Sequence, residues 1–304
     1  MSAAQAIAEA LGNGYRSGDW WRCRCPVHGS SGAALALRDG PTGLTAYCHA
    51  ECSRNDVFEE LARLGFLYGA EMPAAPDPEE IERQRAREER GRLRRTAAAI
   101  DYWLNDTAPP TDTIVGRYWE ARGLTEMPIP ETIRSSLGWL RHPSGGARPA
   151  MIALVEHVER GRVAIHRTWL QVDGAAKASL SPSRMALGPV GGAAIRLAPA
   201  TEYEPLVIGE GIETTASVML ATGYPGWAAI SAGGIERLVL PPLPIAAVVI
   251  IGADHDQNGT GERAARAAAA RWLAEGRQVR LALPPQAGTD WNDVLNEGEA
   301  RNAA

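Results

Sequence analysis

Lysine is almost absent from this sequence, and its scarcity bears on nucleotide binding. Lys177 is the single lysine among 31 basic residues, and it lies in the segment GAAKAS. A phosphate-binding P-loop needs a lysine that follows a glycine and precedes serine or threonine. Because GAAKAS lacks that glycine spacing, we expect neither a P-loop ATPase nor a fused helicase motor of that type. The arginine-rich remainder is best explained by a GC-rich genome.

Long apolar runs and a secretion leader are missing too. The longest apolar stretch, around Ala246–Ile251, is far shorter than the roughly 20 residues that cross a membrane. The N-terminus lacks the basic start and apolar core of a signal peptide. With only four cysteines in 304 residues and no such signal, we expect the reducing cytoplasm, no membrane partner, and a metal site in place of a disulfide scaffold.

A uniform basic charge is also lacking. The formal net charge is −5, which excludes a coat that is basic all round but allows a local basic groove. Eight basic and three acidic residues lie between Arg141 and Arg196, a net charge of +5. From Tyr203 onward, seven basic and twelve acidic residues give a net charge of −5. The sequence therefore predicts a basic middle segment beside an acidic C-terminal segment.

Composition and periodicity divide the chain into four predicted parts. Residues 1–70 combine short helices and strands with Cys- and His-bearing turns. Their hydrophobic core is small, so we expect a cross-link such as a bound metal to stabilise this part. Residues 71–104 form a proline-rich linker and a charged helix. Residues 105–200 form a mixed α+β basic module, and residues 201–304 alternate strands and helices, which favours a mostly parallel sheet. The predicted fold class is α/β with several domains.

Two close pairs of metal-ligating residues stand in the first part. Cys25-Pro-Val-His28 is followed, after nineteen residues, by Cys48-His-Ala-Glu-Cys52. Zinc favours four thiolate or imidazole ligands in a tetrahedron, and two pairs on tight turns supply them. We expect structural Zn²⁺ on Cys25, His28, Cys48 and Cys52, with Cys23 and His49 as rival donors. The alternative is a set of free thiols in a small, loop-rich domain.

Carboxylates follow two predicted strands of the last part. Glu210 ends the strand LVIGE, and Asp254 and Asp256 end the strand VVIIGAD. Ligands of parallel α/β sheets bind beyond the carboxyl ends of the strands. Crowded carboxylates repel one another unless cations lie between them, so Mg²⁺ or Mn²⁺ is expected there for phosphoryl transfer. Ordinary turn chemistry would explain the Asp residues but not Glu210 at the matching strand end.

At this point the residues resemble a known family. The segments IGEGIETTASVMLATG, AISAGGIERLVLPP, VVIIGADHDQNGTGERAA and GTDWNDVL look like the Toprim domain of phage and plasmid primase-like proteins, over about Tyr203 to Leu295. The segment SGDWWRCRCPVHG and the later LTAYCHAECSRNDVFEELARLG resemble the zinc-binding domain of the same primases. The middle part, from RYWEARGL through RHPSGGARPAMIALVEHVERGRVAIHRTWLQVDGAAKASLSPSRMALGP, resembles the module between the two.

The resemblance implies roles for named residues. Glu210, Asp254 and Asp256 match the catalytic acidic residues of Toprim, and Asp290 and Asp293 match a trailing motif with a metal or structural role. A further four residues match the face for nucleotide and template: His166, Arg167, Lys177 and Arg184. Lys177 or Arg167 could equally form an ordinary surface ion pair, and His166 could have a structural role in a strand. Trp20, Trp21 and Tyr47 beside the zinc ligands could stack on DNA bases or pack in the small domain.

The resemblance implies a DNA primase that makes short RNA primers on single-stranded DNA from NTPs by metal-dependent nucleotidyl transfer. Its setting would be phage, plasmid or mobile-element replication, in a bacterial cell or a phage-infected host. A separate replicative helicase is the expected partner. One alternative is a Toprim metallonuclease, which would activate water with the same carboxylates. The other is a non-catalytic zinc and Toprim protein that binds DNA in replication or recombination.

Overall fold

The computed structural model describes residues 2–29, 32–40, 43–50, 52–67, 78–254 and 259–302. The chain divides into two compact units, Met1–Arg87 (unit 1) and Glu88–Ala304 (unit 2). Helix α3 (Pro78–Asn105) contains the boundary between them. Among the described residues, no helix has both the length and the apolar character needed to cross a bilayer.

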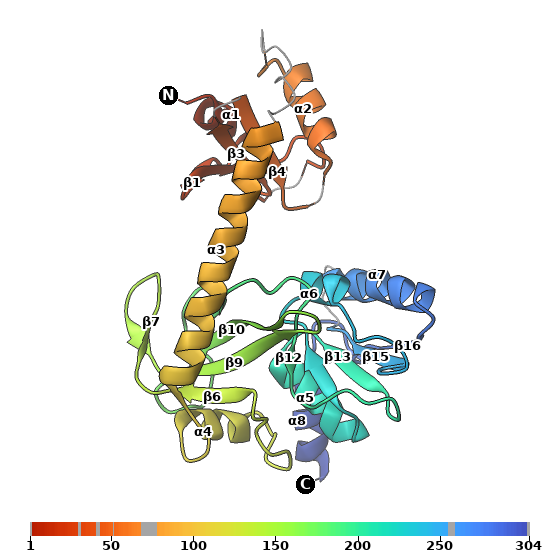
Figure 1. Cartoon of the computed structure of the whole chain (residues 1–304). Coiled ribbons are helices and arrows are strands. Elements are labelled where there is room, and N and C mark those ends of the chain that lie inside the picture. Colours follow the sequence, from red (N-terminus) through yellow and green to blue (C-terminus); the bar gives the residue numbers. More distant parts are fainter. Residues whose placement is uncertain are drawn as a thin grey trace. The chain divides into compact units, whose positions relative to one another are not determined.

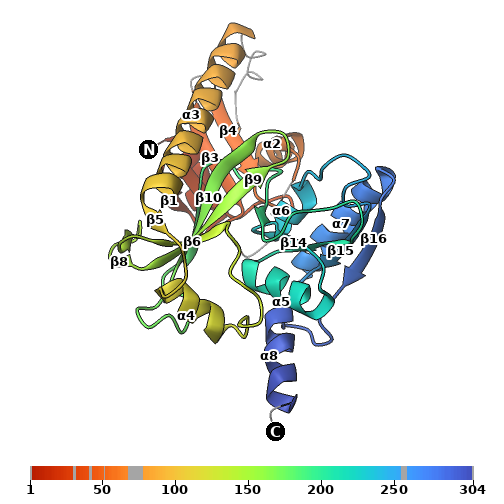
Figure 2. The same cartoon turned by 60° about the horizontal axis from the view of Figure 1, so that its bottom comes forward.

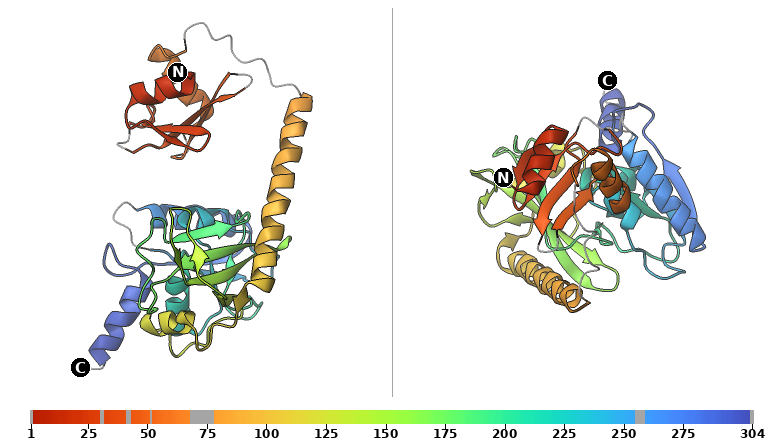
Figure 3. Two further views of the ribbon diagram at one scale, coloured as in Figure 1. Left: turned by 90° about the vertical axis from the view of Figure 1, so that its left-hand side faces the viewer. Right: turned by 90° about the horizontal axis from the view of Figure 1, so that it is seen from above.

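Unit 1 is a four-stranded antiparallel sheet with two helices on one face (Figure 3). Its elements are α1 (Ala3–Leu11), β1 (Tyr15–Ser17), β2 (Trp20–Cys23), β3 (Leu35–Gly40), β4 (Gly43–Cys48) and α2 (Arg54–Arg63). Each helix begins at a serine whose hydroxyl accepts a backbone N–H of the first turn, Ser2 from Gln5 and Ser53 from Asp56. Because strand residues alternate, Leu35 and Leu37 face the helices and complete a small core.

The first sheet of unit 2 is antiparallel in the order β11-β10-β9-β6-β5. Its strands are β5 (Thr107–Ala108), β6 (Ile133–Ser136), β9 (Ala150–His157), β10 (Gly161–Trp169) and β11 (Arg184–Leu187), and a hairpin of β7 (Leu140–Arg141) and β8 (Ala147–Arg148) stands apart. Helix α3 lies along one face of this sheet (Figure 2), and its Ala99 and Trp103 share a buried cluster with β9 and β10. Helix α4 (Ile114–Ala121) packs against the other face. Cover on both faces explains why the sequence of β9 is apolar almost throughout.

The second sheet of unit 2 has the order β12-β14-β13-β15-β16, and only β12 is antiparallel to its neighbour. The elements are β12 (Ile195–Arg196), β13 (Leu206–Gly209), α5 (Ile212–Thr222), β14 (Gly226–Ala228), α6 (Ala232–Arg237), β15 (Val248–Gly252), α7 (Thr260–Ala274), β16 (Gln278–Ala282) and α8 (Trp291–Asn302). Helices α5 and α8 cover one face, and α6 and α7 cover the other (Figure 1). The predicted α/β class with a mostly parallel C-terminal sheet is confirmed.

The two sheets of unit 2 share one hydrophobic core. Val155 of β9, Ile195 of β12 and Ile212 of α5 belong to a single buried cluster. Backbone hydrogen bonds also join the sheets, because Glu156 and Ala194 exchange N–H···O bonds of 2.9 and 3.0 Å. The basic module and the acidic sheet are therefore one packed body, and α5 lies at their junction.

Candidate functional site

The Cys and His pairs of unit 1 meet in one cluster. The donor atoms of Cys25, His28, Cys48 and Cys52 all lie within 4.8 Å of one another. His28 Nδ1 is 3.1 Å from Cys52 Sγ and 3.8 Å from Cys48 Sγ, and the Sγ atoms of Cys25 and Cys52 are 4.0 Å apart. A tetrahedral zinc site with bonds of about 2.3 Å to sulfur requires separations of about 3.8 Å. The donor set and its spacing therefore fit Zn²⁺.

The rival donors lie elsewhere. Cys23 is fully buried in the core of unit 1 and is not one of the four clustered residues, and burial raises the pKa of its thiol to about 12. His49 directs Nε2 to the guanidinium of Arg22 and packs its ring edge-on against Tyr47, with 4.8 Å between ring centroids. The described structure therefore groups the four residues that the spacing predicts and leaves both rivals outside.

The acidic residues of the second sheet follow neighbouring parallel strands. Gly209 of β13 pairs with Gly252 of β15, so Glu210 and Asp254 leave the same edge of the sheet, one and two residues later. Asp254 Oδ1 accepts a hydrogen bond of 3.5 Å from Thr214 Oγ1 of α5. Carboxylate oxygens beyond the carboxyl ends of parallel strands suit a hard divalent cation. The third predicted ligand, Asp256, lies outside the described residues.

Asp290 and Asp293 form a reciprocal cap at the start of α8. Asp290 Oδ1 accepts the backbone N–H groups of Asn292 and Asp293 at 2.8 and 2.9 Å. Asp293 Oδ2 accepts the backbone N–H of Asp290 at 3.0 Å. Buried Asn292 ties this turn to α5 by donating to Ser217 Oγ at 3.1 Å. These contacts match a capping box, which is the structural one of the two roles predicted for this motif.

The four residues of the predicted basic face divide between two sides of β10. His166 and Arg167 are adjacent in the strand and so point to opposite faces. Arg167 donates to the carbonyl oxygens of Met185 and Ala186 at 3.4 and 3.1 Å, and its guanidinium lies 5.4 Å from the ring centroid of Trp169. Arg167 is thereby engaged in packing on the α3 side of the sheet.

His166 faces the second sheet together with two of the predicted cations. The ring is buried, and its Nδ1 atom has no hydrogen-bond partner within the described residues. Burial is the main cause that lowers the pKa of His166 to about 4, and the positive charges of Arg184 and Lys177 lower it further, against the opposing effect of Glu213. His166, Lys177 and Arg184 therefore share one electrostatic environment, which Arg167 enters only as a minor contributor.

The residue at the centre of this environment, Glu213, is absent from the sequence prediction. It lies in the first turn of α5, three residues after Glu210, and its side chain is only 8% exposed. Its Oε1 atom accepts the hydroxyl of Tyr118 at 2.6 Å and lies 3.1 Å from Lys177 Nζ. Burial acts to raise the pKa of Glu213, but Lys177 and Tyr118 outweigh it and lower the pKa to about 2. One sequence signal was available, because Glu213 is the only charged residue in α5.

Two known domain families match parts of this chain. A Toprim domain model matches residues 205–300, and a domain of unknown function (DUF7146) matches residues 93–197. No curated protein matches the chain. The C-terminal part of the chain is thus a Toprim domain, and the predicted combination of a Cys-His-Cys-Cys group with a Toprim domain, as in primase-like proteins, is confirmed.

Solved structures similar to this chain include bacterial primases. The zinc-binding and RNA polymerase domains of the Aquifex aeolicus primase are 15% identical, with 99% of this chain and 82% of that chain covered and a TM-score of 0.40. The DnaG primase catalytic domain bound to single-stranded DNA is 17% identical, with 72% of this chain and 81% of that chain covered and a TM-score of 0.43.

Proposed function

We propose that this chain is a DNA primase that synthesises short RNA primers on single-stranded DNA by metal-dependent nucleotidyl transfer, in the replication of a phage, plasmid or other mobile element. The observation that carries the proposal is the meeting of opposite charges in unit 2. Lys177 and Arg184 come from the basic module and lie around Glu213, at the sheet edge that bears Glu210 and Asp254. The transfer of a nucleotide requires carboxylates that hold metal ions, next to basic side chains that bind phosphates.

The proposed roles follow from this arrangement. Mg²⁺ or Mn²⁺ held by Glu210, Asp254 and Asp256 would neutralise charge on the triphosphate and make the primer-end hydroxyl more acidic. Lys177 and Arg184 bind the phosphate oxygens, Arg184 with a fork of donors and Lys177 as a point charge. The primer-end hydroxyl attacks the α-phosphorus, a new P–O bond forms, and the bond to pyrophosphate breaks.

The proposed grip on single-stranded DNA comes from unit 1, on the sheet face opposite α1 and α2. Pairing registers place Tyr15, Arg22 and Tyr47 in one row across the strands, and Trp20 beside Arg38 in the next. Tyr15 and Tyr47 are 53% and 57% exposed, and the guanidinium of Arg38 lies 4.7 Å from the Trp20 ring centroid. Aromatic rings that alternate with cations on an open sheet suit stacked bases and their phosphates.

The test is incorporation of labelled NTPs on single-stranded DNA with Mg²⁺ or Mn²⁺, for wild type, Asp254→Asn and Asp256→Asn. We expect short RNA products from wild type and a loss of at least about 1,000-fold in both variants, because the cation loses a charged ligand. Asp101→Asn, which changes an exposed carboxylate on α3, is the control and keeps full activity.

Other outcomes of the same assay would contradict the proposal. Metal-dependent loss of the template without RNA product would indicate the nuclease. Tight DNA binding with neither product nor loss, also when a replicative helicase is added, would indicate the non-catalytic binding protein. The helicase partner itself stays a prediction.

A further inference from the structure

The side chain of Lys177 is held by a buried partner and still has an open side. Its side chain is 26% exposed, whereas that of Glu213, its partner at 3.1 Å, is 8% exposed. An ammonium group has three N–H donors, and the contact with Glu213 Oε1 uses one of them. Lys177 can therefore keep this contact and donate to an oxygen of a bound anion at the same time.

The loop that carries Lys177 is anchored at its other end on α4. Arg117 Nε donates to the carbonyl oxygen of Asp173 at 3.2 Å. Gly174 has φ +81°, and a Cβ atom there would lie 2.9 Å from both Arg117 Cβ and the Ile114 carbonyl oxygen. Only glycine fits this close approach without strain. The same helix supplies Tyr118, which holds Glu213, so loop and carboxylate are set by one scaffold.

Glu213 also lies beside the turn that leads from Glu210 into α5. A Cβ atom at Gly211 would lie 3.5 Å from Glu213 Oε2 and 3.8 Å from both Arg184 Nη1 and Thr214 Oγ1. Thr214 in turn donates to Asp254. The carboxylate of Glu213 is thus placed between the two predicted phosphate-binding cations and the acidic edge of the sheet.

We propose that Glu213 is a positioning residue that holds Lys177 at the acidic edge in the orientation that binds the triphosphate of an incoming nucleotide. For the role of Lys177 the inference rests on the proposed function. Glu213 itself does not touch substrate. A buried carboxylate is costly to keep ionised, and the N-terminal turn of α5 together with Lys177 and Tyr118 offsets that cost.

The test is a double-mutant cycle on nucleotide binding, measured by calorimetry with magnesium ATP in the full-length chain. The variants are Glu213→Gln, Lys177→Met and the combination of both. Gln keeps the shape and the acceptor for Tyr118 but removes the charge. We expect each single variant to weaken ATP binding about tenfold and the double variant to be no weaker than Lys177→Met, because Glu213 acts through Lys177.

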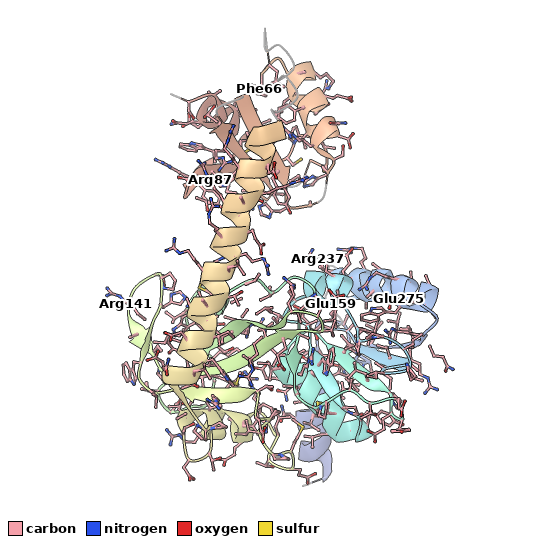
Figure 4. The ribbon with its side chains drawn as sticks, viewed as in Figure 1. Phe66, Arg87, Arg141, Glu159, Arg237 and Glu275 are labelled. Carbon is pink, nitrogen blue, oxygen red and sulfur yellow. The ribbon has the colours of Figure 1, made fainter. Side chains whose placement is uncertain are left out.

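The matched control is Glu275→Gln. Glu275 lies at the C-terminal end of α7 (Figure 4), away from the acidic edge, and also forms an ion pair of 3.1 Å, with buried Arg277. We expect ATP binding within about twofold of wild type for this variant. An equal loss in Glu275→Gln, or single losses that multiply in the double variant, would overturn the inference. If Glu213→Gln does not fold, Glu213→Asp, which keeps the charge but shortens the reach, replaces it and should weaken binding less than Lys177→Met.

Primer synthesis by wild type is measured on the same preparations, so that the positioning role of Glu213 and the primase activity can be rejected independently of each other. Coupled losses in ATP binding without any primer synthesis, also when a replicative helicase is added, would uphold the positioning role and reject the primase. Primer synthesis with losses that multiply would reject the positioning role and leave the primase in place. In the active enzyme, we expect Glu213→Gln to raise the KM for NTP by about tenfold with a smaller change in kcat.

Discussion

Units 1 and 2 differ in what occupies their interiors. The core of unit 1 is small, and the buried thiols of Cys25 and Cys48, two of the four clustered metal ligands, take the place of further apolar side chains. Unit 2 has apolar clusters on both sides of its sheets and also contains a buried carboxylate and a buried histidine, beside which lie two cations that keep access to solvent. A small unit needs a metal to hold its fold, whereas a larger unit can accommodate charges that serve its site.

Removing the metal is the strongest test of this difference between the two units. Replacing Cys48 by Ala should release zinc and unfold unit 1, because zinc contributes about 10 kcal/mol or more to such small domains. Unit 2, with its own cores, should keep its protection from hydrogen exchange. Zinc content per chain and exchange rates in β3 and β9 measure the two effects.

The control for this experiment is Cys23→Ala, since Cys23 is a buried cysteine of the same unit outside the cluster. It should keep zinc. Loss of zinc from Cys23→Ala, or full zinc content in Cys48→Ala, would show that the ligand set is wrong.

We expect low pH to destabilise unit 2 through protonation of His166. Its pKa is lowered to about 4 in the folded chain by burial and by Arg184 and Lys177, so the unfolded chain binds more protons between about pH 4 and 6.5. The free energy of unfolding should therefore fall as pH drops through that window, by roughly 3 kcal/mol. In His166→Gln most of this slope should disappear, and the remainder belongs to His157 and Glu213, whose pKa values are also lowered in the folded chain. Urea unfolding at several pH values, followed by hydrogen exchange in β10, checks the result, and an unchanged slope would contradict it.

Two adjacent tryptophans of unit 1 are expected to have different roles, one in DNA binding and the other in core packing. Trp20 lies on the open sheet face with Arg38, whereas Trp21 packs against the core. Trp20→Ala should weaken binding of a single-stranded oligonucleotide about tenfold, in keeping with roughly 1–3 kcal/mol per stacked base. Trp21→Ala should lower stability instead. Fluorescence anisotropy and thermal unfolding measure the two, and equal binding losses in both variants would argue against a stacking face.

The smallest expected effect concerns the cap of α8. Asp290→Ala removes the acceptor of two backbone N–H groups and should lower the stability of unit 2 by about 1 kcal/mol. If capping is its role, primer synthesis should remain within a few-fold of wild type. A loss of more than about 100-fold at unchanged stability would make Asp290 a metal ligand.

Much of the fold follows from local patterns. The apolar runs in β9 and β10, glycines that end helices, and cysteines on tight turns are properties of neighbouring residues, and the predicted strand–turn–strand and strand–helix order is present. The strand-end position of Glu210 and Asp254 is also a local property, because it needs only the end of an apolar run. The separation of His166 from Arg167 could have been predicted too, since adjacent strand residues face opposite sides.

The short-range features follow from the order of the residues alone: the paired zinc ligands, the carboxylates at two strand ends, and the excess of positive charge in the middle. Which distant residues come into contact depends on how the chain folds. Glu213 looks in sequence like an ordinary acid in the first turn of a helix, yet Tyr118, 95 residues earlier, donates to it and Lys177 forms its ion pair. The physical reason is that burial and the pKa of a carboxylate depend on contacts across the core, which no local pattern encodes.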